Sequence, residues 1–164
     1  MPRLVQAHFW KDARHYQVAA LTTLVVVNLG WIDFGARPDN TALALAACLV
    51  TQFVFSRWAG EPLDLRSPLI TGLSLSLLLR ADEPWLHALA GVIAIGSKFL
   101  LRIDGKHIWN PAGFAIVVLL VTAKSNVWIS PGACGSNVWF GAMLCFFAIL
   151  LLVAAMRSDI GVLF

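Results

Sequence analysis

The most polar stretch that adjoins an apolar segment spans residues 96–112 and contains Lys98, Gly105, His107 and Asn110. A lysine near the end of an apolar segment either reaches toward water along its aliphatic stem or faces the protein interior, where its charge can neutralise an anionic group. His107 could ligate a metal or a haem, but no second histidine stands at helical spacing from it, and the other three histidines are isolated as well. A solvated or otherwise satisfied side chain is therefore the favoured interpretation for all four histidines, and no metal site is predicted.

Two short apolar segments, residues 68–79 and 111–123, each open with a proline and could present polar groups to a ligand. Helices of this length reach about 18–20 Å, short of the roughly 30 Å of bilayer hydrocarbon, so their ends must be buried in protein or flank a cavity. Ser67 and Asn110 directly precede the prolines and are predicted to be N-caps. Free backbone N–H groups at such starts attract an anion, a phosphate or a carbonyl oxygen, and paired discontinuous helices point to a binding site. Short helices that merely pack against longer neighbours are the alternative interpretation.

The elements that must position these residues follow from composition. Hydrophobic residues make up 59% of the 164 residues and charged residues 13%, whereas soluble domains are about half apolar and about a quarter charged. A soluble globule of this size cannot bury that much apolar surface, so we expect an integral membrane protein. Four further apolar segments are long enough, or nearly so, to cross a bilayer: residues 16–34, 41–58, 84–101 and 137–156.

The predicted fold is an all-α polytopic membrane protein with about four full transmembrane helices and two short half-helices. Residues 1–15 are expected to form a cytoplasmic or interfacial tail, because they lack the apolar core of a secretory signal, and residues 16–164 a single transmembrane domain. If all six segments cross, a cytoplasmic N-terminus places eight Lys and Arg inside and three outside, as the positive-inside rule prefers. A short segment that re-enters would change this count. Six tryptophans at or near segment ends agree with an interfacial belt.

Other kinds of chemistry find little support in the sequence. It contains no nucleophile elbow, phosphate-binding P-loop or acid/base pair of carboxylates, so there is no self-contained catalytic constellation, and whether the protein is an enzyme stays open. The three cysteines lack metal-binding spacing, and the scattered basic residues give no support for a nucleic-acid partner. Gly72, Gly91 and Gly96 are expected to permit close contact between helices.

Three motifs together resemble a known membrane family. Residues 67–73 read Ser-Pro-Leu-Ile-Thr-Gly-Leu, Lys98 follows, and Asn110-Pro111-Ala112 comes twelve residues after that lysine. This pattern, across about residues 66–131, resembles the RnfD and NqrB subunits, which carry an S-x-L-x-T-G-L stretch and a G-K segment with a glycine-rich loop that ends in N-P-A. These subunits belong to the Rnf electron-transport complex and to the sodium-pumping NADH:quinone reductase. The N-P-A match, with its spacing to the lysine, is the more specific part.

The resemblance implies a fold of two inverted repeats, similar to that of urea transporters, and a role in carrying electrons with a bound flavin, in a bacterial inner membrane. Three departures qualify it. The chain has about half the length of a typical member, loop glycines are largely replaced around a retained Gly105, and the S-G-A-T flavin-attachment motif is missing. Its nearest counterpart, residues 130–134, contains no threonine. Covalent FMN is therefore not expected, and a non-covalent flavin or a quinone is the cofactor that the resemblance leaves open.

We therefore expect one half of an RnfD/NqrB-like fold, which acts as an accessory or cofactor-binding subunit of a redox complex, with other membrane subunits and the lipid bilayer as partners. Asn110 would cap its helix and offer hydrogen bonds, and Lys98 would offset the charge of a reduced flavin or a quinone headgroup. Two alternatives stay open: a structural accessory subunit of a larger respiratory or photosynthetic complex, and a small-solute channel or transporter of urea-transporter-like fold. If a cofactor binds, the candidate residues at the two half-helix starts are Ser67, Thr71 and Gly72, and Lys98, Gly105, His107 and Asn110.

Overall fold

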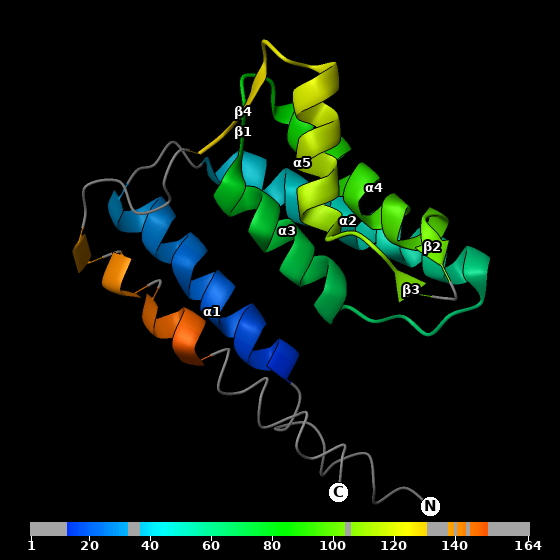
Figure 1. Ribbon diagram of the computed structural model, residues 1–164, viewed down its shortest axis with the longest axis horizontal. Coiled ribbons are helices and arrows are strands. Elements are labelled where there is room, and N and C mark those ends of the chain that lie inside the picture. The colour runs from blue at the N-terminus through cyan, green and yellow to red at the C-terminus, as the bar shows by residue number, and fades with distance from the viewer. Residues whose placement is uncertain are drawn as a thin grey trace, which may run out of the picture.

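The computed structural model describes residues 13–32, 37–103, 106–130, 138–139, 141–143 and 145–150, and these residues are mostly helical (Figure 1). In chain order the elements are α1 (Ala13–Val27), a π-helical turn (Asn28–Ile32), α2 (Pro38–Ala59), α3 (Arg66–Leu78), β1 (Leu79–Ala81), α4 (Pro84–Leu100), β2 (Arg102–Ile103), β3 (Lys106–His107), α5 (Pro111–Thr122) and β4 (Val127–Ile129). The predominantly helical character predicted from the sequence is thus confirmed.

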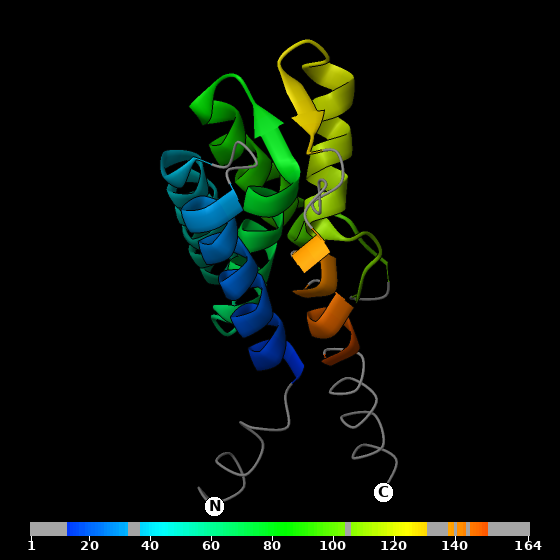
Figure 2. The same cartoon turned by 90° about the vertical axis from the view of Figure 1, so that its left-hand side faces the viewer.

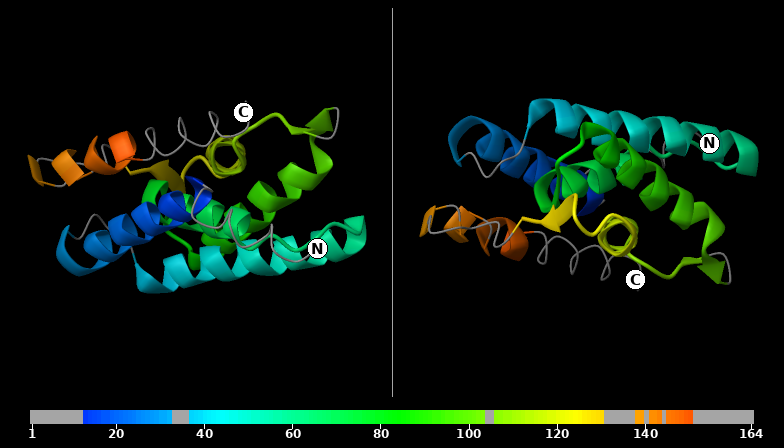
Figure 3. Two further views of the ribbon diagram at one scale, coloured as in Figure 1. Left: turned by 90° about the horizontal axis from the view of Figure 1, so that it is seen from below. Right: turned by 90° about the horizontal axis from the view of Figure 1, so that it is seen from above.

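The helices form an up-and-down bundle in which α1, α3 and α5 begin at the end where α2 and α4 finish (Figure 1). α3 lies in the middle and contacts α1, α2, α4 and α5. Figure 3 shows α2 along one side of the bundle and α5 on the opposite side. We name the end that carries β1 and β4 the strand end. The opposite end is named the basic end after its cations, which are Arg14, Arg57, Arg66, Lys98, Arg102 and Lys106.

Local sequence determines where three of the helices begin and end. Pro38 and Pro84 lie in the first positions of α2 and α4, where a missing N–H removes no intrahelical hydrogen bond. Asn110 caps α5 as predicted, because its Oδ1 accepts a hydrogen bond from the backbone N–H of Ala112 at 3.1 Å. α2 ends at Gly60, whose φ of 65° is a left-handed conformation that glycine adopts without strain.

The start of α3 differs from the prediction. The helix begins at Arg66, the N-cap position is Leu65, and no side chain of that residue caps the helix. Ser67 therefore lies inside the first turn, and the prediction that it is an N-cap is wrong. The physical reason is Asp64, whose Oδ1 accepts a hydrogen bond from the backbone N–H of Arg66 at 3.1 Å and so engages an otherwise orphan donor of the first turn.

The longer predicted segments correspond to helices whose ends are shifted. Residues 41–58 fall within α2, and residues 84–101 match α4 to within one residue. Residues 16–34 correspond to α1 and its π-helical turn, and α1 begins at Ala13, inside the predicted tail. Residues 33–34 lie outside the described residues.

The last predicted segment, residues 137–156, is described only in part. Its described residues between 138 and 150 are helical, and residues 151–156 lie outside the described residues. Met143 and Phe147 pack against the buried cluster that joins α1 to α3. The segment is therefore part of the bundle as far as the structure describes it.

Two short antiparallel strand pairs, which were not predicted, join the ends of helices. β1 and β4 pair at the strand end, with Leu79 opposite Ile129 (Figure 2). The chain leaves α3 and α5 at neighbouring places, and strand pairing satisfies backbone groups that the helices no longer engage. β2 and β3 form the second pair, with Arg102 opposite His107. Leu79 is consequently extended, although the sequence analysis predicted a helix over residues 68–79.

Two glycines allow neighbouring helices to approach closely. A Cβ atom on Gly72 of α3 would lie 3.2 Å from the Cα of Leu45 in α2, and one on Gly91 of α4 would lie 3.1 Å from a carbonyl oxygen of α2. A Cβ on Gly96 would meet its nearest neighbour at 4.0 Å, which is an ordinary contact. The predicted close contact is therefore present at Gly72 and Gly91 and absent at Gly96.

Among the described residues, α2 is the one helix long and apolar enough to cross a membrane by length and composition. The core helix of a soluble protein can meet the same two criteria, so they do not by themselves place α2 in a membrane. α1 has 15 residues and α4 has 17. The structure therefore shows a helical bundle, and the four full transmembrane helices stay a prediction.

The burial pattern of α2 is polar inside and apolar outside. Its exposed side chains include Val50, Phe53, Val54 and Trp58, which are 48–73% exposed. Its buried residues are small or polar: Asn40, Thr41, Ala44, Cys48, Thr51, Gln52 and Ser56. A helix at the surface of a soluble domain shows the opposite arrangement.

Candidate functional site

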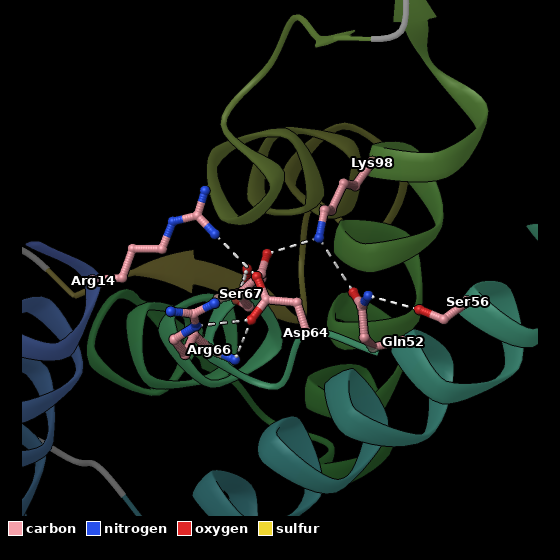
Figure 4. Close-up of polar contacts among 8 residues, drawn as sticks. Arg14, Gln52, Ser56, Asp64, Arg66, Ser67 and Lys98 are labelled. Atoms are coloured by element: carbon pink, nitrogen blue, oxygen red, sulfur yellow. Dashed lines mark hydrogen bonds and ion pairs between the residues drawn. The ribbon is translucent and has the colours of Figure 1, made fainter. Parts of the chain in front are cut away.

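The candidate site lies at the basic end, where the side chain of Lys98 reaches from α4 to the first turn of α3 (Figure 4). Its Nζ donates a hydrogen bond to the Oγ of Ser67 at 2.9 Å and a longer one to the Oε1 of Gln52 in α2 at 3.4 Å. Three helices thus converge on one half-buried ammonium group. The structure brings together Ser67 and Lys98, which the sequence had placed at different half-helix starts.

Gln52 is a part of the site that the sequence analysis missed. It is 2% exposed, and its Nε2 donates a hydrogen bond to the Oγ of Ser56, which is 3% exposed, at 3.0 Å. A buried amide needs partners for its donor and its acceptor, and Ser56 and Lys98 provide one each. A signal was present in the sequence, because Gln52 and Ser56 are four residues apart in an apolar segment and so share one helix face.

Asp64, in the loop before α3, ties α1 to α3 beside the site. Its Oδ2 accepts from Arg14 at 3.0 Å and its Oδ1 accepts from the Nε of Arg66 at 3.1 Å. Partial burial acts to raise the pKa of Asp64, but the hydrogen bonds from Arg66 and the charges of Arg66 and Arg14 outweigh it and hold the pKa below its usual range. The carboxylate therefore stays ionised, with two guanidinium groups against it.

Glu61 and Arg102 form a second ion pair, between the same loop and the segment after α4. Both guanidinium NH groups of Arg102 donate to the carboxylate, the second one at 3.2 Å, so the pair is bidentate. The hydrogen bond from Arg102 lowers the pKa of Glu61, and the same contact raises the pKa of Arg102. Both carboxylates of this loop are thus paired with arginines.

Lys98 forms no ion pair within the part of the chain that the structure describes. Both of its hydrogen-bond acceptors, Ser67 and Gln52, are neutral. An ammonium group has three N–H donors, so one is left for a further acceptor, and the Ser67 hydroxyl can donate as well as accept. The arrangement can therefore neutralise an anion or bind a carbonyl oxygen. No cluster of His, Cys, Asp and Glu that could hold a metal occurs among the described residues.

Thr71 and Gly72, two further residues of the predicted site, serve the packing of α3. The Oγ1 of Thr71 donates to the backbone carbonyl of Ser67 at 3.0 Å, and the side chain is 5% exposed. Gly72 makes the close contact with Leu45 described above. Neither residue has a hydrogen bond to Lys98 within the described chain, so their contribution to the site is the conformation and position of α3.

The other candidate residues that the sequence analysis listed with Lys98 do not take part in the hydrogen bonds of Lys98 within the described residues. Asn110 is exposed, and its Oδ1 accepts from the backbone N–H groups of Ala112 and, at 3.5 Å, Gly113, so its acceptor is used for capping. His107 is exposed in β3 and has no hydrogen bond to Lys98 within the described residues. Gly105 lies outside the described residues.

Two buried polar residues at the strand end lie far from the predicted site. Arg80 is 6% exposed and donates to the backbone carbonyls of Ser76 and Leu79 at 2.9 and 2.8 Å. His87 is 2% exposed, and its Nδ1 has no hydrogen-bond partner among the described residues. The interpretation of the histidines as satisfied or solvated stays a prediction for His87. A single histidine within an apolar run carries no signal of its partners.

In comparisons with known proteins, no protein-family model, curated protein or solved structure matches the chain. The resemblance to RnfD and NqrB consequently rests on the motifs at residues 67–73, 98 and 110–112. Of these motifs, the first and second meet in space through Ser67 and Lys98.

Proposed function

We propose that this chain is a membrane-embedded subunit of an electron-transport complex, similar to RnfD and NqrB, that holds a flavin or a quinone non-covalently beside Lys98. In this proposal the longer helices cross a bacterial inner membrane, and α3 and α5 extend through only part of it. The basic end faces the cytoplasm, in keeping with the positive-inside rule. The partners are other membrane subunits of the redox complex.

The membrane location is supported by the surface of α2. The exposed apolar face of α2 carries Val50, Phe53 and Val54, whereas Gln52 and Ser56 are buried against other helices. Helices in a bilayer direct polar side chains inward and place small residues where helices touch, because lipid tails solvate the apolar side chains. An exposed apolar face of this kind on a soluble protein would drive aggregation.

Exposed tryptophans at both ends of the bundle agree with the same location. Trp58 and Trp109 lie at the basic end, and Trp85 and Trp128 lie at the strand end, and their exposed fractions range from 44% to 73%. Tryptophan concentrates at the two membrane–water interfaces, where its ring is apolar and its N–H is hydrated.

The observation that carries the cofactor proposal is the ammonium group of Lys98, held by Ser67 and Gln52 with no carboxylate bonded to it among the described residues. A half-buried cation is costly unless an opposite charge or a strong acceptor lies against it. The deprotonated ring of a reduced flavin and the carbonyl oxygen of a quinone are such acceptors. Both would be stabilised by a fixed cation that two other helices keep in place.

The test is the cofactor content of the chain purified in a mild detergent, measured by its absorption spectrum and by acid extraction. We expect flavin or quinone near one per chain in the wild type. A hydrogen bond to a charged group contributes about 1.5–3 kcal/mol, so Lys98→Met should weaken binding on the order of tenfold to a hundredfold. Lys98→Arg should retain part of the cofactor binding, and Lys124→Met, at the strand end, is the matched control.

Two results would contradict the proposal. Equal cofactor content in Lys98→Met and the wild type, with unchanged circular dichroism, would exclude this site. A wild-type chain that integrates into membranes without any cofactor would exclude cofactor binding altogether. In that case co-purification with redox subunits would identify an accessory subunit, and solute flux into proteoliposomes would identify a channel or transporter.

A further inference from the structure

The two ends of the molecule carry different charge. The described charged residues of the basic end are six cations and two carboxylates: Arg14, Arg57, Arg66, Lys98, Arg102 and Lys106, with Glu61 and Asp64. Those of the strand end are three cations and three carboxylates: Arg37, Arg80 and Lys124, with Asp39, Asp82 and Glu83. Among the described residues, positive charge is thus in excess at the basic end and balanced at the strand end.

Charge and apolar surface meet in the last turns of α2. Arg57 is exposed, and its guanidinium carbon lies 5.2 Å from the ring centroid of Phe53, which is 48% exposed on the apolar face of the same helix. The next residue, Trp58, is 73% exposed. This arrangement is typical of a helix end at the membrane–water interface. It combines a cation, an aromatic ring beneath the cation and an exposed tryptophan.

An aromatic ladder continues this surface from α2 to α4. Trp58 meets Phe55 edge to face, with ring centroids 5.9 Å apart, and Phe55 stacks on Phe99 of α4 at 5.4 Å. The guanidinium of Arg102 and the ammonium of Lys98 lie over the Phe99 ring at 4.9 and 5.6 Å from its centroid. The ladder therefore runs from an exposed apolar ring to a pair of cations.

We infer that this surface binds an anionic phospholipid, with an acyl chain along the rings of Trp58, Phe55 and Phe99. The phosphate lies near Arg57 and near the two N–H donors of Arg102 that Glu61 and the Lys98 carbonyl leave over. The inference rests on the membrane location in the proposed function and adds a partner of stated chemistry. Basic residues next to a bilayer attract anionic headgroups over distances that salt limits to about a Debye length. The charge excess of the basic end complements an anionic lipid, and the balanced strand end does not.

The test measures lipid selectivity of the full chain in nanodiscs and detergent micelles. Native mass spectrometry would compare the retention of phosphatidylglycerol and phosphatidylcholine, supplied in equal amounts. We expect a preference for phosphatidylglycerol that falls about fivefold for each cation removed, in Arg57→Gln and Arg102→Gln. Arg57→Lys, which keeps the charge, should restore the preference. Arg37→Gln and Lys124→Gln are matched controls at the strand end and should leave it unchanged.

The outcomes separate this inference from the proposed function. Flotation with phosphatidylcholine vesicles but equal retention of the two lipids would overturn the lipid site and leave the membrane location standing. A comparable loss of the phosphatidylglycerol preference in the strand-end variants would also overturn the lipid site, because the preference would then depend on overall charge. A chain that floats with neither kind of vesicle would overturn the membrane location itself. A preference that survives Arg57→Gln and Arg102→Gln together would exclude this surface.

Discussion

The two short helices, α3 and α5, start with the same kind of local signal, a polar residue followed by a proline, and differ in their surroundings. Each has a proline in its first turn, after Ser67 in one case and after Asn110 in the other. α5 begins at the surface and is capped by its own Asn110. α3 begins without a side-chain cap from its N-cap residue, and its Ser67 is engaged by Lys98 of α4.

The difference teaches that a half-helix start is a candidate site only where other elements complete it. At α5 the capping oxygen satisfies the first backbone N–H groups, so little is left for a ligand. At α3 a cation from another helix approaches the first turn, and buried Gln52 holds it there. The same local signature therefore has a structural role in one helix and a candidate functional role in the other.

The largest expected effect comes from Gly72 in α3, and Gly113 in α5 is its comparison. Gly72→Ala in α3 places a Cβ 3.2 Å from the Cα of Leu45, so the helices must separate, and overpacking of this kind costs about 1–3 kcal/mol. Gly113→Ala in α5 meets its nearest neighbour at 3.8 Å and should raise the free energy of unfolding by about 0.5–1 kcal/mol, because alanine favours a helix more than glycine does. Thermal unfolding in detergent, followed by circular dichroism, measures both. Equal effects would show that the two helices are packed alike.

The second-largest expected effect comes from the N-cap of α5, and it distinguishes capping from ligand binding. Asn110→Ala removes the cap of α5 and should cost about 1 kcal/mol, whereas Asn110→Asp and Asn110→Ser should keep most of that stability because both residues are good N-caps. Cofactor content per folded chain should not change in any of the three. A loss of cofactor in Asn110→Ala that Asn110→Ser does not restore would instead make the start of α5 part of the site.

The smallest effect concerns the loop that precedes α3. The pKa of Asp64 lies below its usual range, so its ionised form stabilises the fold above the ordinary carboxyl pKa, and this contribution is lost as the pH falls through the lowered value. Asp64→Asn should therefore cost about 0.5–1 kcal/mol at neutral pH, less at high salt, and nothing in acid. Denaturant unfolding of both proteins across pH measures the difference. A difference that does not vary with pH would exclude the ion pairs as its cause.

Local signals were predictable because their partners are near in the chain. The cap of Asn110 is two residues from the N–H that it engages, and Pro111, which was predicted to open α5, acts within the same turn. The N-cap prediction failed for Ser67 because Asp64 competes for the same first turn, and two plausible caps cannot be ranked from residue types alone. The strand pairs escaped prediction since each has two or three residues and depends on where two helices end.

The sequence by itself determined that the chain is helical, where most of its apolar segments lie, and that residues of suitable chemistry exist at Ser67 and Lys98. Only the tertiary structure decided that Lys98 meets Ser67 and Gln52, which are 31 and 46 residues away, and that Asn110 does not join them. The reason is that a helix periodicity assigns a side chain to a face, whereas the partner of that face depends on how the helices pack. That packing is set by contacts such as Gly72 against Leu45, which no single segment contains.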